Sequence, residues 1–178
     1  SNMQDKFENK TAIIVGGSSG IGFEIAKQLS STGATVFIAS RNPPSDILVA
    51  DYLYCDVREE EQIKSTIKQV VDQTGTVDIL VNSMGVTGTD NVENISINAW
   101  KEVIDTNLTG TFLTCKEVIP IMKKKQYGKI VNIASIAGRF RSEISGAHYV
   151  ASKAAIIGFT RQIAYESIPF GINVNAVC

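Results

Sequence analysis

The sequence predicts an α/β fold class, in which a doubly wound parallel sheet carries helices on both of its faces. Two observations predict this. Short β-branched runs alternate along the chain with longer segments that have helical apolar spacing. The β-branched runs are also almost continuously apolar, which is typical of parallel strands buried on both faces. The length of 178 residues favours one domain, which we expect over residues 3–178, after Ser1 and Asn2 as a tag remnant.

The first part of the chain predicts three strands and one helix. The apolar run at 11–15 is the first strand, and the helix over 20–31 has apolar residues at i, i+4 spacing. A second strand follows at 34–40. The segment 42–50 contains two prolines and is too short for a crossover helix, and the third strand is expected at 52–57.

The second part continues the alternation of helix and strand. A helix over 59–73 has one apolar face, and the run at 77–82 predicts the fourth strand. The remaining elements are a long helical region, a strand, a helix and a sixth strand, expected at 97–124, 128–135, 150–166 and 171–177. Ligands of such a sheet bind at the carboxyl ends of its strands, so we expect functional residues to follow strands.

Composition and charge argue against several classes of function. A net charge of −1 without a long basic run does not favour nucleic-acid binding, and the lysines at 123–125 fall where a helix should end. No apolar run approaches the ~20 residues of a membrane span, and no secretory leader is seen. The three cysteines form no CxxC pair, which predicts neither a disulfide framework nor a metal site. The expected location is the cytoplasm.

A glycine-rich turn follows the first predicted strand, in the sequence VGGSSGIGFEIA. Gly16 permits a tight turn, Gly20 lets the backbone approach a pyrophosphate, and Gly22 allows close packing of helix on strand. The free N–H groups of the helix start, with the hydroxyls of Ser18 and Ser19, are suitable anion donors. The pattern predicts a dinucleotide site between strand and helix.

The residues after the next two strands bear on which dinucleotide binds. A carboxylate after the second strand would bind the ribose 2′-hydroxyl of NAD, but this position holds Ser40, followed by Arg41. A guanidinium pairs with a 2′-phosphate, which favours NADP(H) over NAD(H). After the third strand, Asp56 has two equally supported roles: it accepts a hydrogen bond from the adenine amino group, or it caps the following helix.

Polar residues after the later strands are candidates for chemistry. Gly85, in NSMG, either stands where backbone could pass close to a cofactor or marks a plain transition from strand to loop. Asn107 and the following Thr-Gly are poor helix formers inside a long helical region, which suggests a kink with a functional polar group. If Tyr149 opens a helix, Lys153 lies one turn further on the same face. The only histidine, His148, lacks a nucleophile-elbow serine as a partner, and we interpret it as a loop residue.

Six motifs in this order resemble the short-chain dehydrogenase/reductase family: GGSSGIG, CDV, NSMG, NLTG, NIAS and YVASK. The resemblance runs from Asn9 to Cys178 and implies a Rossmann-like sheet. It implies a catalytic set formed by Asn107, Ser135, Tyr149 and Lys153. It also implies a cofactor-binding set that comprises Gly16, Ser18, Ser19, Gly20, Ile21, Gly22, Arg41, Asp56, Val57, Asn82 and Gly85, together with Tyr149 and Lys153.

The chemistry that the resemblance implies is carbonyl reduction or its reverse. A phenol is a poor base at neutral pH, and an adjacent ammonium favours its phenolate form. Tyr149 is then the general acid/base, and Lys153 supports it and holds the nicotinamide ribose. Ser135 orients the substrate oxygen, and Asn107 anchors a water in the proton relay. No metal is implied.

The sequence departs from the family pattern at several places. Val15 stands where a threonine is usual, and Ser83 with Met84 replaces Asn-Ala in the motif NNAG. The loop 136–148 is one residue longer than usual. The family's sheet has a seventh strand, for which this chain carries no segment, so six strands are expected.

The leading hypothesis is an NADP(H)-dependent oxidoreductase acting on a ketone or secondary alcohol, and a 3-oxoacyl thioester is a candidate substrate. Arg139 and Arg141 are candidates to meet an anionic substrate group, or are solvated loop charges. The alternatives are a nucleotide-binding but catalytically defective protein that acts by cofactor sensing or partner assembly, and a methyltransferase of another doubly wound class. The resemblance implies a homodimer or homotetramer, formed through the helices at 97–124 and after Tyr149.

Overall fold

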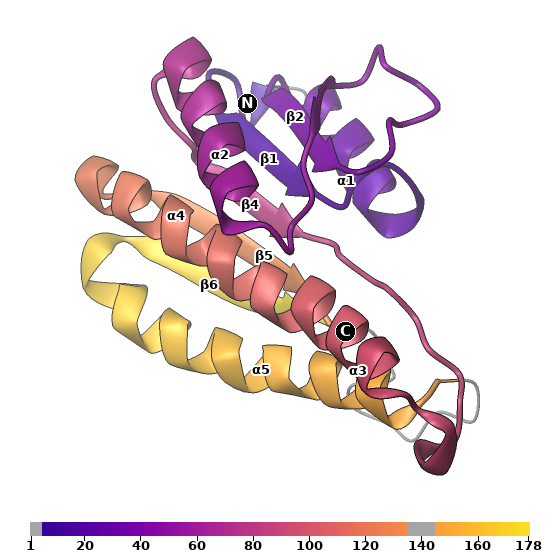
Figure 1. Ribbon diagram of the computed structural model, residues 1–178. Coiled ribbons are helices and arrows are strands. Elements are labelled where there is room, and N and C mark those ends of the chain that lie inside the picture. Colours follow the sequence, from indigo (N-terminus) through magenta and orange to yellow (C-terminus); the bar gives the residue numbers. More distant parts are fainter. Residues whose placement is uncertain (1–4, 135–144) are drawn as a thin grey trace.

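A computed structural model describes residues 5–134 and 145–178, and its centre is a six-stranded sheet (Figure 1). All neighbouring strands are parallel, in the order β3-β2-β1-β4-β5-β6. The predicted doubly wound α/β fold is therefore confirmed. The strands are β1 Thr11–Val15, β2 Thr35–Ser40, β3 Asp51–Tyr54, β4 Ile79–Asn82, β5 Gly128–Ile133 and β6 Ile172–Val177.

Among the described residues, five α-helices connect the strands, and each lies where the sequence predicts a helix, with one interruption. They are α1 Gly20–Ser31, α2 Glu60–Thr74, α3 Ile97–Ile104, α4 Gly110–Lys125 and α5 Ala147–Ser167. The long helical region expected at 97–124 is divided by a π-helical segment, Asp105–Thr109. Short 3₁₀ turns lie at Val92–Asn94 and Ile168–Phe170. The helix expected from 150 begins three residues earlier, so Tyr149 lies in its first turn.

Alternate residues of the central strand β1 contact different helix layers, as the two-residue period of a strand allows. In β1, Ile13 and Val15 belong to a buried cluster that includes residues of α2, α4 and α5. Ala12 and Ile14 belong to a second cluster, on the side of α1. At β6 only the first face is buried, because Asn173 is exposed on the other. Within the described residues, coverage of both faces therefore holds at β1 but not at β6.

A buried polar network ties the sheet to α4 and α5 beneath the strand ends. Asn82 Nδ2 donates to Asn132 Oδ1 over 2.9 Å, joining β4 to β5. Thr114 Oγ1, on α4, donates to Asn82 Oδ1 over 2.7 Å. Asn132 Nδ2 donates to Thr160 Oγ1, on α5, over 2.9 Å. All four side chains are buried and out of reach of water, so their polar groups depend on one another for hydrogen bonds.

We predict that Asn132→Ala destabilises the fold, because it leaves the amide of Asn82 and the hydroxyl of Thr160 with fewer buried partners. The unfolding free energy from urea titration should fall by about 2–4 kcal/mol, since an unpaired buried polar group costs about 1–3 kcal/mol. The exposed Asn173→Ala, on the neighbouring strand, is the control and should change it by less than about 0.5 kcal/mol. Equal losses in the two variants would contradict the stabilising role of the network.

Candidate active site

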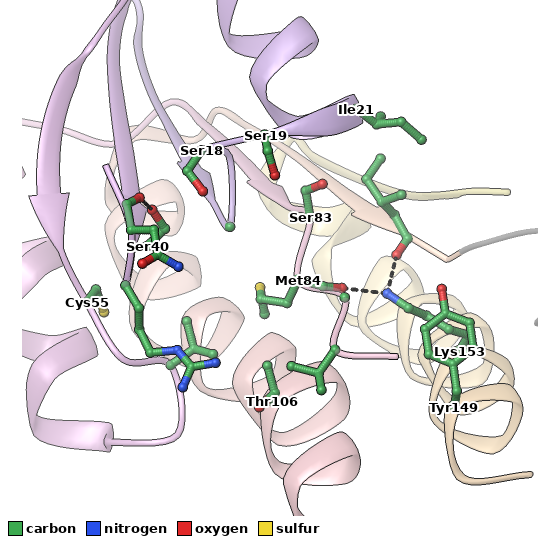
Figure 2. A pocket seen from close by; sticks show the side chains of 17 residues that line it. Ser18, Ser19, Ile21, Ser40, Cys55, Ser83, Met84, Thr106, Tyr149 and Lys153 are labelled. Atoms are coloured by element: carbon green, nitrogen blue, oxygen red, sulfur yellow. Dashed lines mark hydrogen bonds between the residues drawn. The ribbon is translucent and has the colours of Figure 1, made fainter. Parts of the chain in front are cut away.

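A cavity of about 340 Å³ lies at the carboxyl ends of the strands, where the strand order reverses between β1 and β4 (Figure 2). This is the position where a doubly wound sheet binds its ligand. The predicted site residues that line it come from five separate segments of the chain. They are Gly16, Ser18, Ser19, Ile21, Arg41, Val57, Gly85, Tyr149 and Lys153.

The glycine-rich turn has the geometry that the sequence predicts for it. Gly16 has a φ of +76°, and a Cβ there would lie 2.7 Å from the carbonyl oxygen of Ser83. At Gly22 a Cβ would lie 2.9 Å from the Cα of Gly17, so α1 packs closely on the turn. Gly20 has a φ of +59° and faces open space. The turn therefore leaves an accessible backbone at the start of α1, as an anion ligand requires.

The cationic end of the cavity is formed after β2. Arg41 lines the cavity, and Ser40 Oγ donates to the carbonyl oxygen of Asn42 over 2.6 Å, which shapes the turn around Arg41. The guanidinium is 43% exposed and lies 3.9 Å from a carboxylate oxygen of Glu102. Arg41 is therefore accessible to a ligand but already has an anionic neighbour.

Asp56 does not cap α2, so that interpretation is wrong. The helix begins at Glu60 after Glu59, whose side chain makes no capping bond. Arg58 instead donates to both carboxylate oxygens of Asp56, at 3.0 and 2.7 Å. These hydrogen bonds lower the pKa of the Asp56 carboxyl. Asp56 Oδ1 also accepts from the backbone N–H of Arg58 over 3.1 Å, so the carboxylate is engaged by the turn that precedes α2. The adenine contact of Asp56 stays a prediction, and its side chain does not line the cavity.

Tyr149 and Lys153 reach the cavity from the same face of α5, beside the loop of Ser83 and Met84 (Figure 2). Lys153 Nζ donates to the carbonyl oxygen of Met84 over 2.6 Å and to that of Ile133 over 3.3 Å. It lies 5.8 Å from the centre of the Tyr149 ring. Burial lowers the pKa of the Lys153 ammonium from 10.5 to about 8. The cavity therefore holds a buried cation next to a phenol.

Asn107 lies in the π-helical segment, which explains the poor helix chemistry of its neighbourhood. It is fully buried. Its Oδ1 accepts from the N–H of Val86 over 2.9 Å, and its Nδ2 donates to the carbonyl oxygen of Val86 over 3.0 Å. Nδ2 also donates to Ser152 Oγ over 3.2 Å. Asn107 thus holds the loop after β4 against α5, and its part in a proton relay stays a prediction.

His148 is not a loop residue, contrary to the interpretation of the sequence. It lies in the first turn of α5 and is only 1% exposed. Its ring fills the space between Gly88 and Gly146, where a Cβ on either glycine would overlap the imidazole. The N–H of Gly146 donates to the carbonyl oxygen of Gly88, and this hydrogen bond holds the two glycines together beside the imidazole. His148 is therefore a packing residue that joins the loop after β4 to the start of α5.

Several predicted residues lie elsewhere. Ser135, Arg139 and Arg141 fall outside the described residues. Asn82 is buried in the polar network under the cavity, and Gly20 and Gly22 shape the turn without lining it.

Sequence reasoning missed other lining residues, among them Cys55, Val86, Thr106 and Ile133. Cys55 directly follows β3 and Ile133 ends β5, so the rule that ligands bind after strands could have found them. Thr106 is 6% exposed, and its hydroxyl has no hydrogen-bond partner within the described residues.

Within residues 5–134 and 145–178, no cluster of three or more histidine, cysteine, aspartate or glutamate side chains could hold a metal ion. No helix in the same ranges is both long and apolar enough to cross a bilayer.

Comparison with known proteins identifies the protein family to which a chain with this cavity belongs. The family model of short-chain dehydrogenases matches residues 10–178, and the chain belongs to this family of oxidoreductases. It is 37% identical to a 3-oxoacyl-(acyl-carrier-protein) reductase of Staphylococcus epidermidis, over 95% of this chain and 73% of the relative. It is 36% identical to a D-beta-hydroxybutyrate dehydrogenase of Rhizobium meliloti, over 95% of this chain and 70% of that one.

Solved structures agree with this assignment. Ligand-free aldohexose dehydrogenase of Thermoplasma acidophilum superposes with a TM-score of 0.92 at 33% identity, covering 98% of this chain and 67% of the other. A variant of actinorhodin polyketide ketoreductase with NADPH gives a TM-score of 0.89 at 36% identity, covering 95% and 69%. The chain thus spans about 70% of the length of the curated relatives named here.

The lowered pKa of Lys153 predicts a pH-dependent stability. Between about pH 8 and pH 10.5 the folded chain has lost this proton while the unfolded chain still binds it. The unfolding free energy should therefore rise with pH across this window, by at most about 3 kcal/mol at about 1.4 kcal/mol per pH unit.

The measurement is the difference in unfolding free energy between the wild type and Lys153→Met, from urea titrations across this window. A difference is needed because burial raises the pKa of other groups, which oppose the trend in both proteins: Tyr52, Cys55, Cys115 and Tyr127. The difference should grow in favour of the wild type as the pH rises. A difference independent of pH would contradict a buried Lys153.

Proposed function

We propose that this oxidoreductase transfers a hydride between NADP(H) and a ketone or secondary alcohol, with Tyr149 as the general acid/base. One observation carries the proposal: a single cavity joins the glycine-rich turn, Arg41, and the Tyr149–Lys153 pair. The first two suit the phosphates of a dinucleotide. The third suits proton transfer to a carbonyl oxygen.

The residues present fit a nicotinamide dinucleotide. The backbone after Gly16 and the hydroxyls of Ser18 and Ser19 are donors for a pyrophosphate. Arg41 is the cation for a 2′-phosphate, and Lys153 is a donor for the nicotinamide ribose. When bound, the cofactor supplies or accepts the hydride.

The chain's own part in the reaction is to move and stabilise a proton at the substrate oxygen. In reduction, Tyr149 Oη donates its proton to the developing alkoxide, and in oxidation the phenolate takes it back. The Lys153 ammonium stabilises the phenolate through its charge. Asn107 contributes by holding the wall of the cavity that Val86 forms, and Ser135 is proposed to orient the substrate oxygen.

The substrate that we propose is a 3-oxoacyl thioester. This rests on the relatives, of which one is named a 3-oxoacyl-(acyl-carrier-protein) reductase and another a D-beta-hydroxybutyrate dehydrogenase. In both named substrates the carbonyl or hydroxyl group is on the β-carbon, two bonds from the carboxyl carbon. Association as a homodimer or homotetramer through α3, α4 and α5 stays a prediction, supported by Phe112 of α4, which is 44% exposed. A molar mass from light scattering tests it.

Tyr149→Phe should abolish turnover while NADPH still binds. Loss of a general acid typically lowers the rate by about 10²–10⁴-fold. The assay is NADPH oxidation with acetoacetyl-coenzyme A and a panel of simple ketones, with NADPH affinity measured by calorimetry. Tyr165→Phe, an exposed tyrosine on the same helix, is the matched control. An active Tyr149→Phe enzyme would overturn the mechanism. Wild-type binding without turnover across the panel would favour a catalytically defective, nucleotide-binding protein.

Arg41→Ala should weaken NADPH binding by about tenfold, because a hydrogen bond to a charged group contributes about 1.5–3 kcal/mol and Arg41 is partly solvated. NADH binding should change less than twofold. Arg161→Ala, on α5 outside the cavity lining, controls for the loss of charge. Equal losses of NADPH and NADH affinity in Arg41→Ala would refute the assignment of the 2′-phosphate to Arg41.

A further inference from the structure

Four charged side chains form a connected cluster at the cationic end of the cavity. Arg41 follows β2, Asp56 and Arg58 follow β3, and Glu102 lies in the last turn of α3. Glu102 Oε2 accepts from Arg58 Nη1 over 2.6 Å, and its Oε1 lies 3.9 Å from Arg41 Nη2. Arg58 also binds Asp56 through two hydrogen bonds. Two cations and two anions therefore balance each other beside the cavity.

The two arginines differ in how they are held. Arg58 has two carboxylate partners, and both lie within 3.0 Å of its guanidinium nitrogens. Arg41 has one ion-pair partner within the described residues, Glu102, at a distance too long for a hydrogen bond. If Glu102 lost its charge, Arg58 would remain bound by Asp56. Arg41, by contrast, would be left without an ion-pair partner among the described residues.

We propose that Glu102 is a specificity-determining residue, which restrains Arg41 and so limits the preference for a cofactor that carries a 2′-phosphate. This inference rests on the proposed NADP(H) function. A 2′-phosphate that approaches Arg41 meets the carboxylate of Glu102, which repels it and competes for the guanidinium. A 2′-hydroxyl is neutral and experiences neither effect. Glu102 therefore disfavours NADPH selectively and leaves NADH almost unaffected.

The size of the effect follows from the exposure of the pair. Arg41 and Glu102 are 43% and 37% exposed, so water and salt screen their interaction. Exposed ion pairs contribute up to about 1 kcal/mol, which corresponds to a change in affinity of up to about fivefold.

The experiment is a titration of the apo chain with NADPH and with NADH by calorimetry at low salt. Glu102→Gln keeps the shape of the side chain and removes its charge. We expect the NADPH affinity to rise by up to about fivefold relative to NADH. Glu93→Gln, an exposed glutamate before α3, makes the same change in net charge and should leave the ratio unchanged. The thermal midpoint of each apo variant checks that the fold is retained.

Arg41→Ala and the double variant complete a thermodynamic cycle. The gain from Glu102→Gln should be smaller in the Arg41→Ala background, because the competition for that guanidinium is then absent and only the direct repulsion of the phosphate remains. A gain of the same size there would overturn this route. An unchanged or lowered NADPH preference in Glu102→Gln, when the wild type binds NADPH, would overturn the inference alone. A wild type that binds neither cofactor would instead overturn the proposed function, and this inference with it.

Discussion

All six strands run in the same direction, and this constraint determines where everything else in the molecule can lie. Their carboxyl ends share one edge, so every segment that follows a strand begins there. The order reverses between β1 and β4, and the chain leaves these two neighbours towards opposite faces of the sheet. The segments that follow β1 and β4 therefore diverge and leave a space between them. At the base of that space the backbone at Gly16 lies close to the carbonyl group of Ser83, so there is no room for a side chain at Gly16.

The two ends of the cavity each carry a positive charge, but one charge is partly exposed to solvent and the other is buried. At one end the Arg41 guanidinium is partly solvated and has a carboxylate nearby, so its charge costs little and is partly neutralised. At the other end the Lys153 ammonium is buried and is held by two neutral carbonyl groups. Burial there lowers its pKa to about 8. The first end is suited to recognising a fixed charge, and the second to chemistry in which a proton moves.

The sequence predicted the fold better than it predicted the site. Apolar runs and helical spacing are local properties, so the six strands and the range of α1 could be derived from short windows. The glycine turn also reaches the cavity as its local pattern suggested, and so do Tyr149 and Lys153, which the family resemblance implied rather than their local spacing. What failed depended on contacts between distant segments. His148 is buried because glycines from two separate loops make room for it, and no window around His148 contains Gly88.

The buried amides of Asn82 and Asn132 have a consequence for how the layers can move. Apolar side chains permit a helix to slide along a sheet with small changes in energy, whereas a hydrogen bond has a fixed partner and direction. Thr114 and Thr160 each form a hydrogen bond with one of these amides, so α4 and α5 are both tied to the same pair of strands, β4 and β5. A shift of either helix by one turn would break a buried hydrogen bond. The network therefore fixes the positions of both helices along the sheet, and with them the position of Tyr149 on α5.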